Sequence, residues 1–329
     1  MSTILGNPIT PGGGLELVVN VDTGATVTAT LGSKTVTGVS VDGQARLKIP
    51  QKGKWTVSAT SGSQVSIPQI ISVPATVEIV FGTQELNDTS WATIKQASDA
   101  GAGANFWAIG DCKQVTMNGK VSDGLPLTNY TAWVFIIGFN HNAEREGNGI
   151  TFQGFKETKN GTPVCLTDSG YNTNKTSGTW FNMNNSATNS GGWQASLMRE
   201  NVMPLIKAAF PADLKAVIKT STIFTAPDTG YIELTATQDE VFLLAEYEVF
   251  GARTNASTQE PNYLKQYSYY SAGNSKVKYR QDATDTAAFW WERSPFSDTS
   301  DRFCMVTTSA ETNSNTAYRS RGVSPVFKV

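Results

Sequence analysis

Hydrophobic and polar residues alternate strictly along residues 15–82. Every second side chain in each run is apolar, and threonine, serine or charged residues lie between, so each run predicts a strand with one buried face. Glycine-containing turn signals separate the runs at the spacing of a small sandwich. The apolar positions are Leu15, Leu17, Val19 and Val21; Ala25, Val27, Ala29 and Leu31; Ala45, Leu47 and Ile49; Trp55, Val57 and Ala59; and Val77, Ile79 and Phe81. We predict a compact antiparallel β-sandwich over residues 15–82.

The segments on either side of this sandwich lack such a pattern. Residues 1–14 end in Thr-Pro-Gly-Gly-Gly, which supports neither a helix nor a strand, and we expect a tail or tether. Residues 83–88 are expected to be a linker. A second domain is predicted over residues 89–329.

The second domain mixes helical and strand patterns and is predicted to be α+β. Asp88, Thr89 or Ser90 can cap a helix that Gly101 terminates. Apolar runs predict buried strands, the glycine pair Gly191–Gly192 and Pro204 predict helix starts, and a long loop is expected before the last strands. The expected strands are 106–112, 130–138, 232–236, 241–250, 303–306 and 323–329, the helices 191–199, 204–210 and 211–218, and the loop 252–270.

Composition narrows the classes of function. The formal net charge is -2 and only 16% of the residues are charged, which disfavours nucleic-acid binding because phosphate recognition needs a basic surface. The hydroxyl-rich surface is typical of extracellular β-proteins and virion components. No signal-peptide pattern or membrane-spanning apolar run is found, and three widely spaced cysteines indicate free thiols made in a reducing compartment. A particle assembled in the cytoplasm and released by lysis fits these observations.

Several ordered motifs then point to a known family. They are Phe106–Asp111, Ile136–His141, Gly191–Arg199, Leu243–Glu246, Trp290–Pro295 and Arg321–Pro325. Together they resemble an uncharacterised domain family of Gram-positive bacterial genomes and their phages, whose signature is WWLRSP followed by GVRPA, over residues 85–329. Glu292 replaces the usual Leu, and Ser324 stands where Arg is common. The residues that carry the signature as structural positions are Trp107, Trp193, Trp290, Trp291, Arg293, Pro295, Gly322 and Pro325.

The resemblance carries expectations about fold. The end of that family is similar to the C-type-lectin-like fold of phage tropism determinants, in which a Trp-rich strand supports a loop-rich face. The N-terminal strands resemble immunoglobulin-like or PEGA-type modules. A C-type-lectin-like domain implies binding or display rather than turnover.

His141 is the only histidine, beside Glu144 and Glu146. A histidine next to two carboxylates is compatible with a metal ligand or a general base. A single histidine cannot build an HExxH-type zinc site, so a hydrogen-bonded structural histidine at a strand end is the favoured interpretation. Glu246 is expected to form a structural hydrogen bond, with Arg293 as its partner.

The triplet Glu260-Pro261-Asn262 is found in calcium-dependent lectins, where Glu and Asn supply oxygen ligands to Ca²⁺. The Trp-Asn-Asp partner motif is missing, so an ordinary loop is favoured and no cofactor is expected. Tyrosines cluster in the same region, and tyrosine is favoured at binding surfaces, although packing under the loop is an even alternative. The expected binding residues are Glu260, Asn262, Tyr263, Tyr267, Tyr269 and Tyr270; no catalytic or metal residues are assigned.

We expect a bacteriophage virion structural protein, exposed on the particle as a capsid decoration or as a receptor-binding protein of the tail or baseplate. The tail and sandwich would attach to other virion proteins, such as the major capsid or tail proteins. The lectin-like domain would face outward toward host-surface glycans, and the chain is expected to form a homo-oligomer. A glycan-active hydrolase, which needs two converging carboxylates, and a cellular adhesin are the alternatives.

Overall fold

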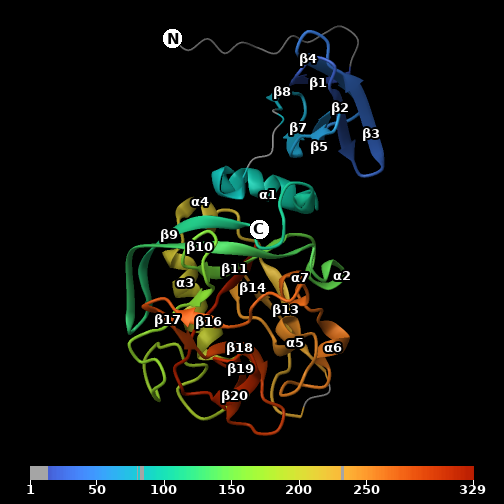
Figure 1. Ribbon diagram of the computed structural model, residues 1–329. Helices are drawn as coiled ribbons and strands as arrows, with labels where there is room; N and C mark the ends of the chain where they lie inside the picture. The colour runs from blue at the N-terminus through green and yellow to red at the C-terminus, as the bar shows by residue number, and fades with distance from the viewer. Residues whose placement is uncertain (1–13, 80, 82–84, 231–232) are drawn as a thin grey trace, which may run out of the picture. The chain divides into compact units, whose positions relative to one another are not determined.

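The computed structural model describes residues 14–79, 81, 85–230 and 233–329, and Figure 1 shows the ribbon. The chain divides into two compact units, Met1–Gln84 and Glu85–Val329. The first 13 residues of the expected tail (1–14) and the first residue of the expected strand 232–236 lie outside the described residues.

The smaller unit consists of strands. They are β1 (Leu15–Asn20), β2 (Thr26–Leu31), β3 (Lys34–Val39), β4 (Gln44–Ile49), β5 (Lys54–Ser61), β6 (Gln64–Val65), β7 (Gln69–Ser72) and β8 (Ala75–Glu78). One sheet has the order β4-β1-β8, and the other has the order β3-β2-β5-β6 with β7 also paired to β5. The inward side chains of both sheets form one hydrophobic core around Trp55, so the predicted sandwich is confirmed.

One pairing in this sandwich differs from the all-antiparallel prediction. β1 and β8 run parallel, with Leu17 opposite Ala75 and Asn20 opposite Glu78. The preceding strand, β7, belongs to the other sheet. The chain therefore crosses from one sheet to the other before β8, and β8 then runs in the same direction as β1. A crossover connection permits parallel pairing, whereas a tight hairpin would not.

The larger unit is also mostly β. Its main sheet has the order β15-β21-β11-β10-β9 and includes the long β9–β10 hairpin (Figure 1). Smaller sheets have the orders β12-β16-β17, β13-β14 and β18-β19-β20. The strands are β9 (Cys112–Ser122), β10 (Leu125–Phe139), β11 (Ile150–Lys156), β12 (Val164–Cys165), β13 (Ser221–Thr225), β14 (Thr235–Asp239), β15 (Val241–Phe242), β16 (Lys278–Arg280), β17 (Ala283–Ala288), β18 (Trp290–Pro295), β19 (Arg302–Val306), β20 (Thr312–Thr316) and β21 (Val326–Lys328).

Short helices connect these strands. They are η1 (Leu86–Asp88), α1 (Trp91–Asp99), η2 (Gly103–Asn105), α2 (Ala143–Glu146), the π-helical turn η3 (Met198–Val202), α3 (Met203–Ala209), α4 (Ala212–Lys215), α5 (Glu246–Phe250), α6 (Glu260–Tyr263) and α7 (Ser268–Ser271). Ser90 caps α1 as predicted, with its hydroxyl accepting a hydrogen bond from the Thr93 amide at 3.1 Å. In the part of the chain that the structure describes, no helix is long and apolar enough to span a membrane.

Two predicted elements were wrong because local hydrogen bonds compete with regular structure. Residues 106–111 do not form a strand, because the Ala108 amide donates to the Asp111 carboxylate at 2.9 Å and turns the chain. Residues 241–250 form a strand only at β15 and continue into α5. The Glu248 carboxylate accepts the Ala245 amide at 2.9 Å and stabilises the start of that helix.

The expected helix over residues 191–199 begins later, at η3. Gly192 has φ +55, and a Cβ there would lie 2.2 Å from the Ala226 carbonyl oxygen, so this segment is a turn held closely against the chain. Pro204 lies in the first turn of α3, as predicted. The expected loop over residues 252–270 contains the short helices α6 and α7.

The signature positions are buried. Trp290 and Trp291 are completely enclosed, and their indole nitrogens donate to the Lys276 and Phe181 carbonyls at 3.0 and 2.9 Å. All eight expected structural positions are buried: Trp107, Trp193, Trp290, Trp291, Arg293, Pro295, Gly322 and Pro325. The expected linker differs from the structure, since residues 86–88 form η1 of the larger unit and Leu86 is buried there.

Candidate functional site

Five ionisable side chains gather inside the larger unit. They come from the turn after β10, the end of α2, helix α5, and strands β18 and β21. All five are buried, with exposures of 9% or less: His141, Glu146, Glu248, Arg293 and Lys328. We call these five residues the buried ionic cluster. Ionised groups are rarely buried unless they are paired, so the burial of these five side chains depends on the partners of each.

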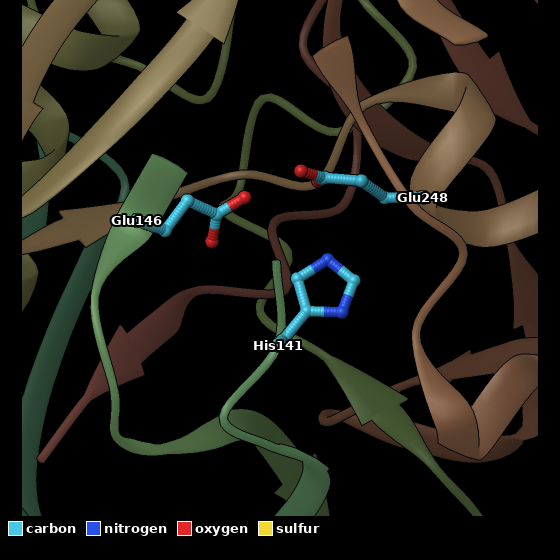
Figure 2. A group of neighbouring side chains, drawn as sticks. All are labelled: His141, Glu146 and Glu248. Carbon is cyan, nitrogen blue, oxygen red and sulfur yellow. The ribbon is translucent and has the colours of Figure 1, made fainter. Parts of the chain in front are cut away.

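His141 lies flat against Tyr267, with ring centroids 3.6 Å apart and an interplanar angle of 13°. Its Nε2 atom is buried and has no hydrogen-bond partner among the described residues. Figure 2 shows this nitrogen directed toward the gap between the carboxylates of Glu146 and Glu248. Burial lowers the pKa of His141 to about 4, so the imidazole is neutral at pH 7 and one ring nitrogen has a free lone pair.

Glu146 is the last residue of α2, and the chain is tightly folded around it. Asn142 has φ 45, a left-handed conformation that asparagine tolerates, and its amide donates 2.9 Å hydrogen bonds to Glu146 Oε1 and to the Tyr263 carbonyl. The Lys328 ammonium lies 3.4 Å from Glu146 Oε2. Burial, followed by repulsion from Glu248, raises the pKa of Glu146 to about 7.

Glu248 is held in place by Arg293. The guanidinium donates to Glu248 Oε2 at 2.6 Å and to Oε1 at 2.8 Å, and it also donates to the Leu243 carbonyl at 2.7 Å. One ligand atom from each of His141, Glu146 and Glu248 lies within 4.8 Å of the others. A neutral imidazole and two carboxylates at this separation can hold a cation or share a proton.

The predicted pairing of Glu246 with Arg293 was wrong. Glu246 accepts hydrogen bonds from the amides of Thr254, Asn255 and Ala256 at 2.7–3.1 Å and from the Thr312 hydroxyl. Glu246 and Glu248 both lie in helix α5, but their side chains point to different sides of it. Glu246 therefore holds the following loop through its amides, and Glu248 forms the ion pair with Arg293.

The calcium interpretation of Glu260-Pro261-Asn262 is contradicted by burial. Glu260 is fully buried at the start of α6, where it accepts the Tyr247 amide at 3.0 Å and the Ser294 hydroxyl. Burial raises the pKa of Glu260 to about 7. Asn262 is exposed, and its amide donates to Gln259 at 2.9 Å. The two residues thus lie in different environments and do not form one cation site.

The tyrosines also differ from the expected contact surface. Tyr267, Tyr269 and Tyr270 are buried, and only Tyr263 remains half-exposed. Tyr270 donates to Gln153 at 2.6 Å, and Tyr269 packs on Phe135. The alternative, packing beneath the loop, is what the structure shows, because α7 turns these rings inward against β10 and β11.

Glu292 is buried between Trp291 and Arg293, and neither carboxylate oxygen has a partner among the described residues. Strand β18 is buried along its whole length, so the alternation of side chains gives it no solvent-facing side. Burial, reinforced by the nearby carboxylates of Glu246, Glu260 and Glu248, raises the pKa of Glu292 well above its usual range. Burial therefore disfavours the ionised form of this carboxyl group.

An open pocket of about 410 Å³ lies beside the buried ionic cluster, and Asn142, which lines the pocket, donates a hydrogen bond to Glu146 of the cluster. Arg145 is positioned at this pocket by ring contacts with Tyr263 at 4.8 Å and Phe224 at 5.8 Å, and by a 3.3 Å hydrogen bond to the Asn262 carbonyl. The lining residues are Asn142, Glu144, Arg145, Tyr247, Pro261, Asn262, Tyr263, Leu264, Lys265 and Gln266. We call this the Arg145 pocket.

A second hollow, of about 600 Å³, lies between α3 and the end of β14. Asp239 there pairs with Arg199 at 2.6 Å and accepts the Trp193 indole at 2.9 Å, and Glu240 pairs with Lys207 at 2.5 Å. These two carboxylates are thus engaged in ion pairs. Glu200 also lines the hollow.

Sequence reasoning found part of this arrangement. His141 and Glu146 are close in sequence, and their residue types indicated metal or acid–base chemistry. Glu248, Arg293 and Lys328 were not connected to them, because they lie more than 100 residues further along and no periodicity links them. The Arg145 pocket includes Asn262 and Tyr263 from the expected binding residues, but Arg145 was not expected.

The comparisons with known proteins cover only part of the chain. A family model described as a domain of unknown function (DUF6273) matches residues 169–329. No curated protein and no solved structure matches the chain. The matched span contains Glu248, Arg293 and Lys328, whereas His141, Glu146 and strands β9 to β12 precede it. The compact larger unit therefore extends beyond the matched span, and both the main sheet and the buried ionic cluster join residues inside and outside it.

Proposed function

We propose that this chain is a bacteriophage virion protein exposed on the particle, whose larger unit binds a saccharide on the host surface through the Arg145 pocket. The smaller sandwich, of immunoglobulin-like type, attaches the chain to other virion proteins, and the larger unit is a C-type-lectin-like domain. The chain works as a homo-oligomer on a capsid or on a tail or baseplate.

The observation that carries this proposal is the set of residues that line the Arg145 pocket, together with the fixed position of the Arg145 side chain. Its volume of about 410 Å³ is within the usual range of ligand sites. Tyr247 and Tyr263 provide aromatic surface, and Asn262, Lys265 and Gln266 provide hydrogen-bonding groups around it. The guanidinium of Arg145 is already fixed by ring contacts, so binding costs little side-chain entropy. Aromatic surface with amide and charged groups is suited to sugar rings and their hydroxyls.

The lectin-like assignment is supported by the way the larger unit closes on itself. Its C-terminal strand β21 lies inside the main sheet, between β15 and β11. The hydroxyl of Ser98, near the beginning of the unit, donates to the Val329 carbonyl. The stretch between β12 and η3 is long and contains no regular strand or helix. A domain with joined ends and a long irregular region agrees with that fold.

A glycan hydrolase is the second candidate, and the hollow near α3 is where it would act. Asp239, Glu240 and Glu200 line that hollow, and a glycosidase needs one carboxylic acid and one carboxylate facing the same bond. Asp239 is paired with Arg199 and Glu240 with Lys207, so neither carboxylate is free to act on a glycosidic bond, which favours binding over hydrolysis.

Two experiments test the proposal. Immunogold labelling with antibodies against the larger unit should mark the particle surface, and unlabelled particles would end the virion assignment. On a glycan array, the purified chain should bind a saccharide, and Arg145→Ala should weaken that binding by about tenfold or more. Arg46→Ala, a matched change at an exposed arginine of the smaller unit, should bind as the parent does. Two results would contradict the proposed saccharide binding. One is equal binding by the Arg145→Ala chain, and the other is cleavage of the glycan by the parent chain but not by an Asp239→Asn chain.

A further inference from the structure

The buried ionic cluster contains a polar atom that the protein itself leaves without a partner. His141 is only 7% exposed, and its Nε2 has no hydrogen-bond partner among the described residues. Buried nitrogen atoms are normally hydrogen-bonded, so an unpartnered one needs a reason. Figure 2 shows Nε2 facing two carboxylates that come from separate elements, α2 and α5.

The three donor groups are close enough to surround one ion. Their ligand atoms lie within 4.8 Å of one another. Around a tetrahedral ion with bonds of about 2.1 Å, ligand atoms are about 3.4 Å apart, so the donors must approach by at most about 1.4 Å. Small side-chain rotations supply such a movement. The stacking of His141 on Tyr267 restricts the ring to this orientation.

Both carboxylates retain lone pairs for a cation. Glu248 Oε2 accepts two hydrogen bonds, from Arg293 and the Ala245 amide, but Oε1 accepts one, from Arg293. Glu146 Oε1 accepts one hydrogen bond, from Asn142. Each carboxylate oxygen can accept two bonds, so Glu146 and Glu248 can each add a metal bond without losing these contacts.

We propose that His141 Nε2, Glu146 and Glu248 form a binding site for a divalent transition-metal ion, with Zn²⁺ as the reference ion. One imidazole and two carboxylates suit Zn²⁺ or Mn²⁺, whereas Ca²⁺ prefers a larger set of oxygen ligands. Arg293 orients Glu248, and Asn142 orients Glu146, as outer residues do in known metal sites. None of the three donors lines the Arg145 pocket, so the metal site does not rest on saccharide binding there.

Lys328 is the competitor for this ion. Its ammonium neutralises Glu146, but all three of its contacts, with Glu146 Oε2, the Glu146 carbonyl and the Gly147 carbonyl, are 3.4 Å long. Such long contacts hold the ammonium weakly compared with the 2.6 Å bond from Arg293 to Glu248. The positive charge of Lys328 lowers the affinity for a metal ion, and removing it should raise that affinity.

The Arg145 pocket provides a route to the cluster. Asn142 lines the pocket, and the same side chain contacts Glu146. We expect an ion to reach Glu146 by movement of the Asn142 side chain at this solvent-open pocket.

The test uses the full chain without an affinity tag, because His141 is its only histidine and a polyhistidine tag would mask the site. The protein is treated with chelator, dialysed and titrated with Zn²⁺ by calorimetry. NMR of the protein labelled with ¹⁵N-histidine follows the imidazole directly. We expect one Zn²⁺ per chain, a large shift of the Nε2 resonance, and no effect of Ca²⁺ at the same concentration.

Variants separate this site from adventitious binding. His141→Gln should weaken Zn²⁺ binding by about tenfold or more, and Lys328→Met should strengthen it. Glu146→Gln should also weaken it, while Glu157→Gln, the same change at an exposed residue, should have no effect. An unshifted Nε2 resonance in the parent chain would overturn the proposal even if a variant failed to fold. Full Zn²⁺ binding by a folded His141→Gln chain would overturn it as well.

Discussion

Arg293 on β18 and Glu248 on α5 form a bidentate ion pair, with nitrogen–oxygen distances of 2.6 and 2.8 Å and both side chains excluded from solvent. The pair joins a strand to a helix 45 residues earlier in the chain. Arg293 also donates to the carbonyls of Leu243 and Phe224, so one guanidinium connects three segments. Its contacts satisfy most of its donors without water.

Removing one member of this pair should be strongly destabilising. Arg293→Met leaves the Glu248 carboxylate buried without its cation, at an expected cost of about 3–5 kcal/mol in the free energy of unfolding. Denaturant unfolding followed by circular dichroism measures it. The double variant Glu248→Met/Arg293→Met should be more stable than Arg293→Met alone, because neither charge of this pair then remains buried without its partner. A loss below about 1 kcal/mol in the single variant would contradict this account.

Replacing Glu292 by Leu should stabilise the protein at pH 7. Its carboxyl group is buried without a partner, and such a group costs about 1–3 kcal/mol. The folded-state pKa of Glu292 is raised, so the folded protein binds a proton that the unfolded chain releases above about pH 4.5. The parent chain therefore loses more stability than the Glu292→Leu chain as the pH rises from 4.5, because Glu146 and Glu260, whose pKa values are also raised, are present in both chains.

The pH dependence of the difference is the decisive measurement for Glu292. Unfolding midpoints of the two chains should diverge between pH 4.5 and pH 7 and approach each other in acid. Glu157→Leu, at an exposed position, should show no stabilisation and no such divergence. A less stable Glu292→Leu chain at pH 7 would show that Glu292 has a partner in solution.

Lys278 should give the opposite pH dependence. It is fully buried, and burial lowers its pKa to about 7 from 10.5. Between these values the unfolded chain binds the extra proton, so stability rises with pH from about 7 to 10.5. The difference corresponds to at most about 5 kcal/mol, and the rings of Phe135 and Trp290, 5.3 and 5.1 Å from the ammonium, offset part of it.

Lys278→Met should therefore be more stable than the parent at pH 7, and this advantage should vanish near pH 10. Thermal unfolding at pH 7, 8.5 and 10 measures it. Lys120→Met, at an exposed lysine, provides the control. If the advantage of Lys278→Met were the same at all three values, Lys278 would not titrate differently in the folded state.

The paired tryptophans should dominate the stability of the larger unit. Trp290 and Trp291 are fully buried, and replacing either by Ala should cost about 3–5 kcal/mol. Each variant also leaves a backbone carbonyl without the indole donor, at Lys276 or Phe181. Trp180, which is only half-buried, is the matched control and should cost less. The comparison is made by denaturant unfolding, and equal losses at all three positions would contradict it.

The sequence was sufficient for features that depend on neighbours along the chain. Alternation with period two placed β1, β2, β4 and β5 of the sandwich, because successive side chains of a strand point to opposite faces, whereas β3, β6 and β7 were not predicted. Ser90 was one of three candidate helix caps and Pro204 was found as a helix start, since each acts on the backbone of its own turn. Burial of Trp290 and Trp291 followed from their size and apolarity.

Only the tertiary structure decided which charged residues meet. Glu246 and Glu248 are equivalent in local pattern, but the direction of α5 places Glu248 against Arg293 and Glu246 against the amides of the following loop. The three donors of the proposed metal site span residues 141–248, and Lys328 approaches them from the last strand. Contacts over such separations depend on how sheets and helices pack, which leaves no periodic trace in the sequence. Local periodicity therefore determined the strands, while packing of distant elements assembled the site.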